Sequence, residues 1–302
     1  MSVERLALYT TVYPGVEPYL ADWYQSVQRQ TDKDFDLYIG VDSLRPEEVT
    51  EAIGALPHAT LLPNAPGTSS AQIRTAALES LVDKYDVIVL VDSDDLLHPS
   101  RVSAARAALR KHDLAGCALS LIDEHGRDLG LTFGPACKAE YDGLLPRYNV
   151  FGLSNTAYRT RTLRRCLPVP EDCLLIDWLL ATRAWASGAA LAFDPTARMS
   201  YRQYANNTAS VLPPFTAQQI LRAAQLVVEH YRLLFTTSKL EVLVSHQVTL
   251  STEFRRAECF HQAITAQGEK LGRYVEALNE LKPKYVWWWC VAHPELEDIW
   301  KN

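Results

Sequence analysis

The stretch Val87–Val91 (VIVLV) runs directly into Asp92–Asp95 (DSDD). Five aliphatic residues in a row predict a strand that is buried on both faces, as in the centre of a parallel sheet. Three carboxylates then crowd the end of this strand, just before a helix start at Pro99–Arg101. Because like charges this close repel one another, the cluster indicates either a divalent-cation site or an Asp-rich turn that caps the helix.

Segments of alternating strand and helix character surround this stretch. Strands are predicted at Leu6–Val12, Leu37–Val41, Ala59–Leu62 and Cys117–Ile122, and helices at Pro18–Gln30, Pro46–Leu56, Ser70–Tyr85 and Pro99–His112. The alternation predicts an α/β fold with helices on both faces of a mainly parallel sheet. In such sheets ligands bind beyond the carboxyl ends of the strands, where Asp92–Asp95 lie. We expect Arg127–Asn149 to be irregular.

The composition is that of an ordinary globular protein. The chain has 302 residues, 48% hydrophobic and 22% charged, which suffices for one large domain or two smaller ones. A net charge of −6 argues against a nucleic-acid partner. The six cysteines form no Cys-x-x-Cys pair and predict no disulfide framework. No apolar run approaches the ~20 residues that span a bilayer, and no signal peptide precedes the first strand, so we expect a cytoplasmic protein.

The aspartate cluster resembles the DxD motif of GT-A glycosyltransferases of family 2. In that family the aspartates hold Mn²⁺ or Mg²⁺ against the diphosphate of a nucleotide-sugar. By this resemblance Asp92 and Asp94 are the expected metal ligands, Ser93 contacts the donor, and Asp95 orients the sugar or ligates through water. The resemblance covers about residues 5–210. It implies a GT-A fold over residues 1–212, with a nucleotide-binding half at about 1–98 and an acceptor half at about 99–212.

Other residues of the first half match the family's nucleotide site. Thr11 and Tyr13 lie where the first strand opens onto the nucleoside, and Asp42 lies where an aspartate holds the base, typically uracil. Gly67 and Arg74 match the family's Asn-x-x-Gly…Arg-Asn segment, although threonine replaces the asparagine after the arginine. Considered without the resemblance, Asp42 is a helix cap or Asx-turn and Arg74 a solvated helix residue.

The acceptor half contains the candidate catalytic base. Family 2 enzymes carry an acidic residue at the head of a helix, in one branch Asp-Trp, and an arginine about two turns later. Asp177, Trp178 and Arg183 match this pattern. We expect Asp177 to be an ionised general base favoured by the helix dipole, and Arg183 to present a cation to the anionic end of the cleft. Glu171–Asp172 is the competing carboxylate pair, and a plain helix cap is the structural alternative for Asp177.

Two further segments complete the match. Ser154 and Asn155 belong to the region that carries the acceptor side of the cleft in the family. Arg202 falls in a segment close to the family's Tyr-Arg-Gln-His-x-x-Asn, which implies a contact with the donor. Tyr204 stands where the histidine is usual. Where that histidine ligates the metal, its loss leaves the ion to the aspartates, the diphosphate and water.

The resemblance implies a metal-dependent, inverting enzyme that moves a single sugar from a nucleotide-diphospho-sugar, with a UDP-sugar favoured. The acceptor would be a hydroxyl of a carbohydrate or glycoconjugate, as in polysaccharide biosynthesis. The Gln-x-x-Arg-Trp motif of processive members is absent. Two alternatives stay open. One is a sugar-phosphate nucleotidyltransferase, although Thr11–Gly15 lacks the Gly-rich basic loop that such an enzyme needs. The other is a non-catalytic nucleotide-binding module of the same fold.

Residues 213–302 lie outside the resemblance and are predicted to form a helical extension. Apolar residues recur with helical spacing over Ile220–Leu234 and Leu271–Leu281, so the catalytic domain or a second copy of the chain must cover them. A homodimer through these helices is therefore one prediction. Trp287–Trp289 predict either aromatic anchoring of the tail or peripheral contact with the inner face of the membrane.

Overall fold

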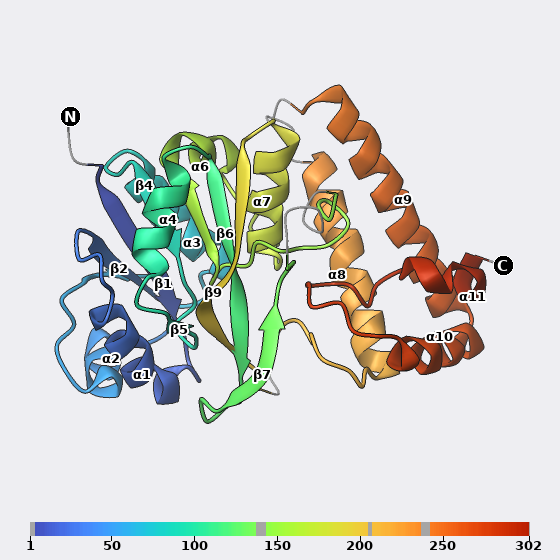
Figure 1. Ribbon diagram of the computed structural model, residues 1–302, viewed down its shortest axis with the longest axis horizontal. Coiled ribbons are helices and arrows are strands. Elements are labelled where there is room, and N and C mark those ends of the chain that lie inside the picture. The colour runs from blue at the N-terminus through green and yellow to red at the C-terminus, as the bar shows by residue number, and fades with distance from the viewer. Residues whose placement is uncertain (1–3, 137–142, 205–206, 237–241, 302) are drawn as a thin grey trace.

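The computed structural model describes residues 4–136, 143–204, 207–236 and 242–301, and it is built on one mixed sheet (Figure 1). The parallel half has the strand order β3-β2-β1-β4. These strands are β1 (Leu6–Val12), β2 (Asp36–Val41), β3 (Thr60–Pro63) and β4 (Val87–Leu90). Every residue of β1 and β4 is buried, as their unbroken aliphatic runs require of strands covered on both faces.

The second half of the sheet mixes strand directions. Beyond β4 the order continues β8-β6-β9-β5, and β7 pairs with β6. These strands are β5 (Leu96–Leu97), β6 (Leu114–Ile122), β7 (Asp128–Phe133), β8 (Thr156–Arg159) and β9 (Leu191–Arg202). β8 is antiparallel to both β4 and β6, whereas β9 is parallel to β6. The predicted mixed, mainly parallel α/β sheet is thereby confirmed.

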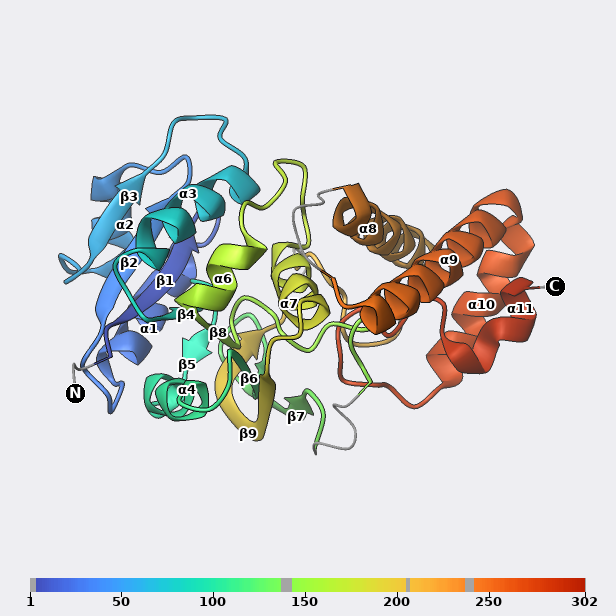
Figure 2. The same ribbon diagram turned by 90° about the horizontal axis from the view of Figure 1, so that it is seen from above.

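Helices cover both faces of this sheet. They are α1 (Glu17–Gln28), α2 (Pro46–Ile53), α3 (Ser70–Val82), α4 (Arg101–Leu109), α6 (Thr160–Cys166) and α7 (Ile176–Ala186). Figure 2 shows α1 and α4 on one face and α3 and α6 on the other. The α3 helix begins with a capping box in which Ser69 Oγ accepts from the Gln72 N–H and Gln72 Oε1 accepts from the Ser69 N–H.

The structure differs from the sequence prediction within Arg127–Asn149, where β7 occupies part of the expected irregular segment. A tight turn joins β6 to β7, and Asp123 Oδ1 accepts from the backbone N–H groups of His125 and Arg127, each at 2.9 Å. Most residues of β7 are exposed. Pairing with β6 through the tight turn, rather than burial of side chains, therefore stabilises this edge strand. Because few of its side chains are buried, its sequence shows only a weak apolar pattern. Residues 137–142 of the segment lie outside the described residues.

The predicted helical extension is confirmed, although its boundary at residue 213 stays a prediction. It consists of α8 (Ala217–Thr236), α9 (Val244–Ala266), α10 (Gly268–Glu280), the 3₁₀ turn η1 (Pro294–Leu296) and α11 (Glu297–Lys301). In Figure 1 these helices lie beside the end of the sheet that carries α7. The apolar stripes of α8 and α10 are largely buried within this one chain. Among the described residues, no helix is both long and apolar enough to cross a membrane.

The three consecutive tryptophans anchor the tail to β7, to α7 and to the segment before α8. Trp287 packs against Phe133, with 4.6 Å between ring centroids. Trp288 stacks on Trp178 at 6.3 Å, and Trp289 meets Phe215 edge-on at 5.3 Å. All three are buried, at most 7% exposed. Their aromatic surface is used inside the fold, so the prediction of anchoring holds and the membrane alternative loses its basis.

Candidate active site

A cavity of about 640 Å³ opens at the carboxyl ends of β1, β2 and β4. Its wall contains Thr11 at the end of β1 and Tyr13 just after it, Asp42 after β2, and Asp92 and Asp94 after β4. Four further predicted residues reach it from other elements: Arg74, Ser154, Asp177 and Tyr204. The crossovers of a parallel sheet bring these strand ends to one edge, which is why residues spread over most of the chain share one cavity.

Two carboxylates of the Asp92–Asp95 cluster face this cavity. Asp94 Oδ2 accepts from the Tyr204 hydroxyl at 2.7 Å and from the Tyr13 hydroxyl at 3.4 Å. Arg74 Nη2 lies 4.0 Å from Asp92 Oδ1. Burial, together with the charge of Asp94, raises the pKa of Asp92 to about 7. The guanidinium of Arg74 therefore does not offset the repulsion between the two carboxylates.

Asp95 lies behind the cavity and not on its wall. It is fully buried, Ser154 Oγ donates to its Oδ2, and the backbone N–H of Arg202 donates to its Oδ1 at 2.8 Å. Ser154 Oγ also accepts from the backbone N–H of Asp92 at 3.0 Å. Asp95 thus ties β9 and the loop before β8 to the end of β4. Its expected role in orienting the sugar or ligating through water stays a prediction.

Asp177 lies in the first turn of α7 and lines the same cavity as Asp92 and Asp94. Its Oδ2 accepts from Asn149 Nδ2 at 2.8 Å. Burial raises the pKa of Asp177 to about 6, although backbone N–H groups at the helix start and Arg74 act to lower it. The helix dipole therefore does not dominate as we expected. The carboxylate is still mostly ionised at neutral pH and is a stronger base than an exposed aspartate.

The competing carboxylates lie elsewhere. Asp172 is exposed and pairs with Arg232 of α8 at 3.1 Å, and neither Glu171 nor Asp172 lines the cavity. Of the two acidic segments weighed from the sequence, only the one at the head of α7 therefore reaches the site.

Asn149 is a site residue that the sequence analysis missed. It is fully buried, and its Oδ1 accepts from the backbone N–H of Phe151 at 2.9 Å. Its backbone pairs with Trp287 in both directions, at 3.3 and 3.1 Å. A lone asparagine in a segment without periodicity gave no signal. It holds Asp177 and is itself held by the tail, so the C-terminal segment supports the candidate base.

We expect Asn149→Ala to lower turnover by about 10-fold or more, because a hydrogen bond to a charged group contributes about 1.5–3 kcal/mol. Losing this donor also raises the pKa of Asp177, so the acid side of the pH–rate profile should move to higher pH. Steady-state kinetics across pH measures both effects, and titration with UDP shows whether the donor site is intact. A variant with the wild-type pH profile would show that Asn149 is only structural.

Arg183 does not reach the cavity. Its Nη1 donates to the backbone carbonyls of Cys166 at 2.6 Å and Pro168 at 2.7 Å, and the residue is only 5% exposed. The predicted role in presenting a cation to the cleft is therefore not supported. Arg74, which projects from α3, is the arginine that lies beside Asp92.

Arg202 supports the aspartates from behind and does not line the cavity. Its Nε donates to the carbonyl of Asp94 at 2.8 Å, and its Nη1 donates to the carbonyl of Glu124 at 2.9 Å. The guanidinium lies 4.5 Å from the centroid of the Tyr19 ring. It fixes the backbone of the aspartate loop, which is a different role from the expected contact with the donor.

Four other predicted residues also lie outside the cavity wall. Ser93 Oγ donates to the carbonyl of Thr11 at 2.8 Å, and Asn155 Nδ2 donates to the carbonyl of Cys117 at 2.6 Å. Trp178 is buried and stacks on His230 at 4.0 Å. Gly67 adopts a φ of +82° in the turn before α3. These residues surround the site without lining the cavity. The donor contacts expected of Ser93 and Gly67, and the place of Asn155 on the acceptor side, stay predictions.

The cavity fits a hard divalent cation with an incomplete protein ligand set. Asp92 and Asp94 supply oxygen donors, the type that Mg²⁺ and Mn²⁺ take. Burial and the charge of Asp94 together raise the pKa of Asp92, and a cation would favour the ionised form of both carboxylates. Within the described part of the chain, no group of three or more His, Cys, Asp or Glu side chains could hold a metal. The ion would therefore take its remaining ligands from a diphosphate and water.

No protein-family model and no curated protein matches the chain. Solved structures do match. TarS 1–349 of S. aureus has a TM-score of 0.58 at 15% identity, covering 91% of this chain and 79% of that one. The same protein in complex with UDP-GlcNAc gives 0.59 at 16%, covering 88% and 75%. The mannosyltransferase PcManGT from Pyrobaculum calidifontis, in complex with GDP-Man and Mn²⁺, gives 0.58 at 14%, covering 91% and 79%.

These similarities confirm the GT-A glycosyltransferase fold. Since 91% of 302 residues is about 275, the likeness extends beyond residue 212 into the helical region. The C-terminal helices are therefore part of the shared architecture, which the sequence motifs alone did not indicate.

Proposed function

We propose that this protein is a metal-dependent glycosyltransferase that moves a single sugar from a nucleotide-diphospho-sugar to an acceptor hydroxyl. The observation that carries the proposal is one cavity lined by Asp92 and Asp94 from the end of β4 and by Asp177 from the head of α7. An acidic pair for a cation and a separate carboxylate that can accept a proton are the groups that such a transfer requires. The solved structures with UDP-GlcNAc or GDP-Man and Mn²⁺ support it through their common fold.

The donor lies along the strand ends in this proposal. Thr11, Tyr13 and Asp42 contact the nucleoside, and Asp42 makes a UDP-sugar the favoured donor by its place in the resemblance. Arg74 contacts the diphosphate from α3. A divalent ion held by Asp92 and Asp94 supplies neutralisation of the charge that develops on the leaving diphosphate.

Asp177 acts as the general base in this proposal. It accepts the proton of the acceptor hydroxyl while that oxygen bonds to the anomeric carbon. The bond from this carbon to the diphosphate oxygen breaks, and its electron pair leaves with the nucleoside diphosphate. One displacement of this kind inverts the anomeric configuration. A base with a pKa of about 6 suits the task, because it is mostly ionised at neutral pH and has a higher affinity for a proton than an ordinary aspartate.

The pH dependence of turnover follows from the same pKa. The ionised form of Asp177 is the active one, so turnover should be full above about pH 7 and fall about tenfold for each unit below about pH 6. Steady-state kinetics with saturating donor, between about pH 5 and pH 8, measures this limb. An acid limb near the ordinary aspartate pKa, or none in this range, would contradict the assignment.

Ligand-dependent stability separates the proposal from its alternatives. Thermal unfolding with UDP or GDP should show stabilisation when Mn²⁺ is present, by about 2.7 kcal/mol at a hundredfold excess over Kd. No stabilisation by either nucleotide would remove the basis of the proposal. A non-catalytic module would bind the nucleotide but would not produce nucleoside diphosphate from a nucleotide-sugar. A nucleotidyltransferase would form nucleotide-sugar from a nucleoside triphosphate and a sugar phosphate.

A further inference from the structure

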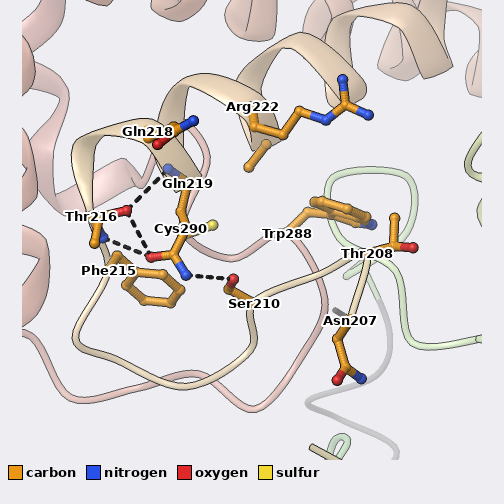
Figure 3. Close-up of a pocket in the computed structure, with 11 residues that line it drawn as sticks. Asn207, Thr208, Ser210, Phe215, Thr216, Gln218, Gln219, Arg222, Trp288 and Cys290 are labelled. Atoms are coloured by element: carbon orange, nitrogen blue, oxygen red, sulfur yellow. Dashed lines mark hydrogen bonds between the residues drawn. The ribbon is translucent and has the colours of Figure 1, made fainter. Parts of the chain in front are cut away.

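A second cavity, of about 500 Å³, adjoins the candidate active site (Figure 3). It lies between the start of α8, the segment that precedes this helix, and the tail around Trp288. Four residues line both cavities: Asn207, Thr208, Arg222 and Trp288. The two spaces therefore share a wall, and the second is built largely from the C-terminal region that the sequence motifs do not reach.

One end of this cavity is occupied by hydrogen bonds of the fold itself. Gln219 Nε2 donates to Ser210 Oγ at 2.9 Å, and Gln219 Oε1 accepts from Thr216 Oγ1 at 3.0 Å. Figure 3 shows these side chains together with Phe215, while Arg222, Trp288 and Thr208 lie at the other end. The first group caps α8. The second group is the part of the cavity that faces the shared wall.

Arg222 provides the charge of this cavity. Among the described residues, its guanidinium has neither an ion pair nor a hydrogen bond, whereas Arg232 on the same helix pairs with Glu229 and Asp172. The described residues that line the smaller cavity include no aspartate or glutamate. An unpaired guanidinium beside neutral amides and hydroxyls favours a planar or tetrahedral anion, which it can bind through two N–H groups.

Trp288 contributes its indole to the shared wall, although only 7% of the residue is exposed. Its backbone has a φ of +69°, a left-handed conformation that costs a non-glycine residue of order 1 kcal/mol and is concentrated at ligand sites. The stack on Trp178, the residue after the candidate base, holds the indole in place. An aromatic ring among amide and hydroxyl groups suits a ligand that presents both C–H faces and hydroxyls, as a sugar ring does.

We infer that the second cavity binds the acceptor, and that the acceptor is a saccharide with an anionic group, phosphate or carboxylate, that pairs with Arg222. This inference rests on the proposed function. The sugar ring lies where the two cavities adjoin, beside Arg222 and the exposed part of Trp288, and the reacting hydroxyl points toward Asp177, which lines the larger cavity. The anion is kept away from Asp92 and Asp94, which would repel it.

Binding of simple probes tests the inference. Glucose 6-phosphate, glucuronate and glucose are titrated onto the full chain with UDP and Mn²⁺ at saturation, with ligand-observed NMR as the readout. Both anionic sugars should bind more tightly than glucose. Comparing the affinities of glucose 6-phosphate and glucuronate shows whether the site prefers a phosphate or a carboxylate. Arg222→Gln should weaken the anionic sugars about tenfold or more, because hydrogen bonds to charged groups contribute about 1.5–3 kcal/mol. Glucose should be little affected.

Arg232→Gln is the matched control, since it removes the same charge from the same helix and lines neither cavity. Equal affinity for glucose and the anionic sugars, or an equal loss in both arginine variants, would overturn the inference and leave the proposed function standing. An equally large loss of UDP affinity in Arg222→Gln would assign the arginine to the donor and also overturn it. No binding of UDP by the wild type would instead overturn the proposed function, and this inference with it.

Discussion

Asp177→Asn is expected to lower turnover by about 10²–10⁴-fold while the affinity for UDP and Mn²⁺ stays near that of the wild type. The asparagine keeps the shape of the side chain and still has an oxygen that can accept from Asn149, but it cannot take up a proton at neutral pH. Steady-state kinetics with saturating donor measures the loss, and calorimetric titration measures the affinity. An active Asp177→Asn enzyme would end the assignment of the base.

Two controls make this result specific. Glu171→Gln and Asp172→Asn should remain active, because neither residue lines the cavity. The second control concerns stability, because the raised pKa of Asp177 predicts how the substitution affects unfolding. In the folded protein the pKa of Asp177 is raised from 3.8 to about 6, so the stability this carboxyl contributes is present below about pH 4 and is lost as the pH rises through about 6. At pH 7 Asp177→Asn should therefore unfold at a temperature no lower than the wild type.

Asp94→Ala is expected to abolish Mn²⁺-dependent binding of UDP while the fold survives. With Asp94 removed, Asp92 is the one carboxylate left of the proposed metal-binding pair, and among the described residues no group of three or more His, Cys, Asp or Glu side chains could hold the ion instead. A hard cation bound through so few oxygens would be held weakly. Calorimetric titration of UDP with and without Mn²⁺ is the measurement.

Asp83→Ala serves as the control for Asp94→Ala. This aspartate is exposed, follows α3 and pairs only at the surface with Arg164, so its loss should leave UDP binding unchanged. Circular dichroism should show the same helix content in both variants. Metal-dependent affinity near the wild-type value in Asp94→Ala would mean that the metal assignment is wrong.

The parallel half of the fold was predictable because its signals are local. Strands buried on both faces read as unbroken aliphatic runs, and Val87–Val91 is such a run followed by polar residues at the ligand-binding edge. The edge strand β7 was not predictable in the same way. Its side chains are mostly exposed, so burial imposed little pattern on the sequence.

The role expected for Arg183 failed for a geometric reason. Asp177 and Arg183 are six residues apart, about 1.7 turns of an α-helix, so their side chains project from different sides of α7. Spacing along the chain suggested a shared cleft, whereas the helical period sends the arginine to the carbonyls of Cys166 and Pro168. The cation beside the aspartates comes instead from Arg74 on α3.

The contribution of the tail to the site is a long-range property that no local pattern encodes. Asn149 pairs with Trp287, 138 positions later, and the same asparagine donates to Asp177. Arg222 and Trp288 meet at the shared wall only after α8 and the tail have packed on the sheet. Sequence reasoning therefore found the candidate base and missed the residues that hold it.

The central claim is that Asp177 takes the proton of the acceptor hydroxyl while the diphosphate of the sugar donor is bound, through a divalent cation, at Asp92 and Asp94. The most direct test measures nucleoside diphosphate released from UDP-GlcNAc and GDP-mannose, in the presence of acceptor sugars, by the wild type and Asp177→Asn side by side, with and without Mn²⁺. Our account predicts release by the wild type that requires Mn²⁺ and falls at least a hundredfold in Asp177→Asn at saturating donor. Release that is unaffected by the substitution, or by omission of the metal, would contradict it.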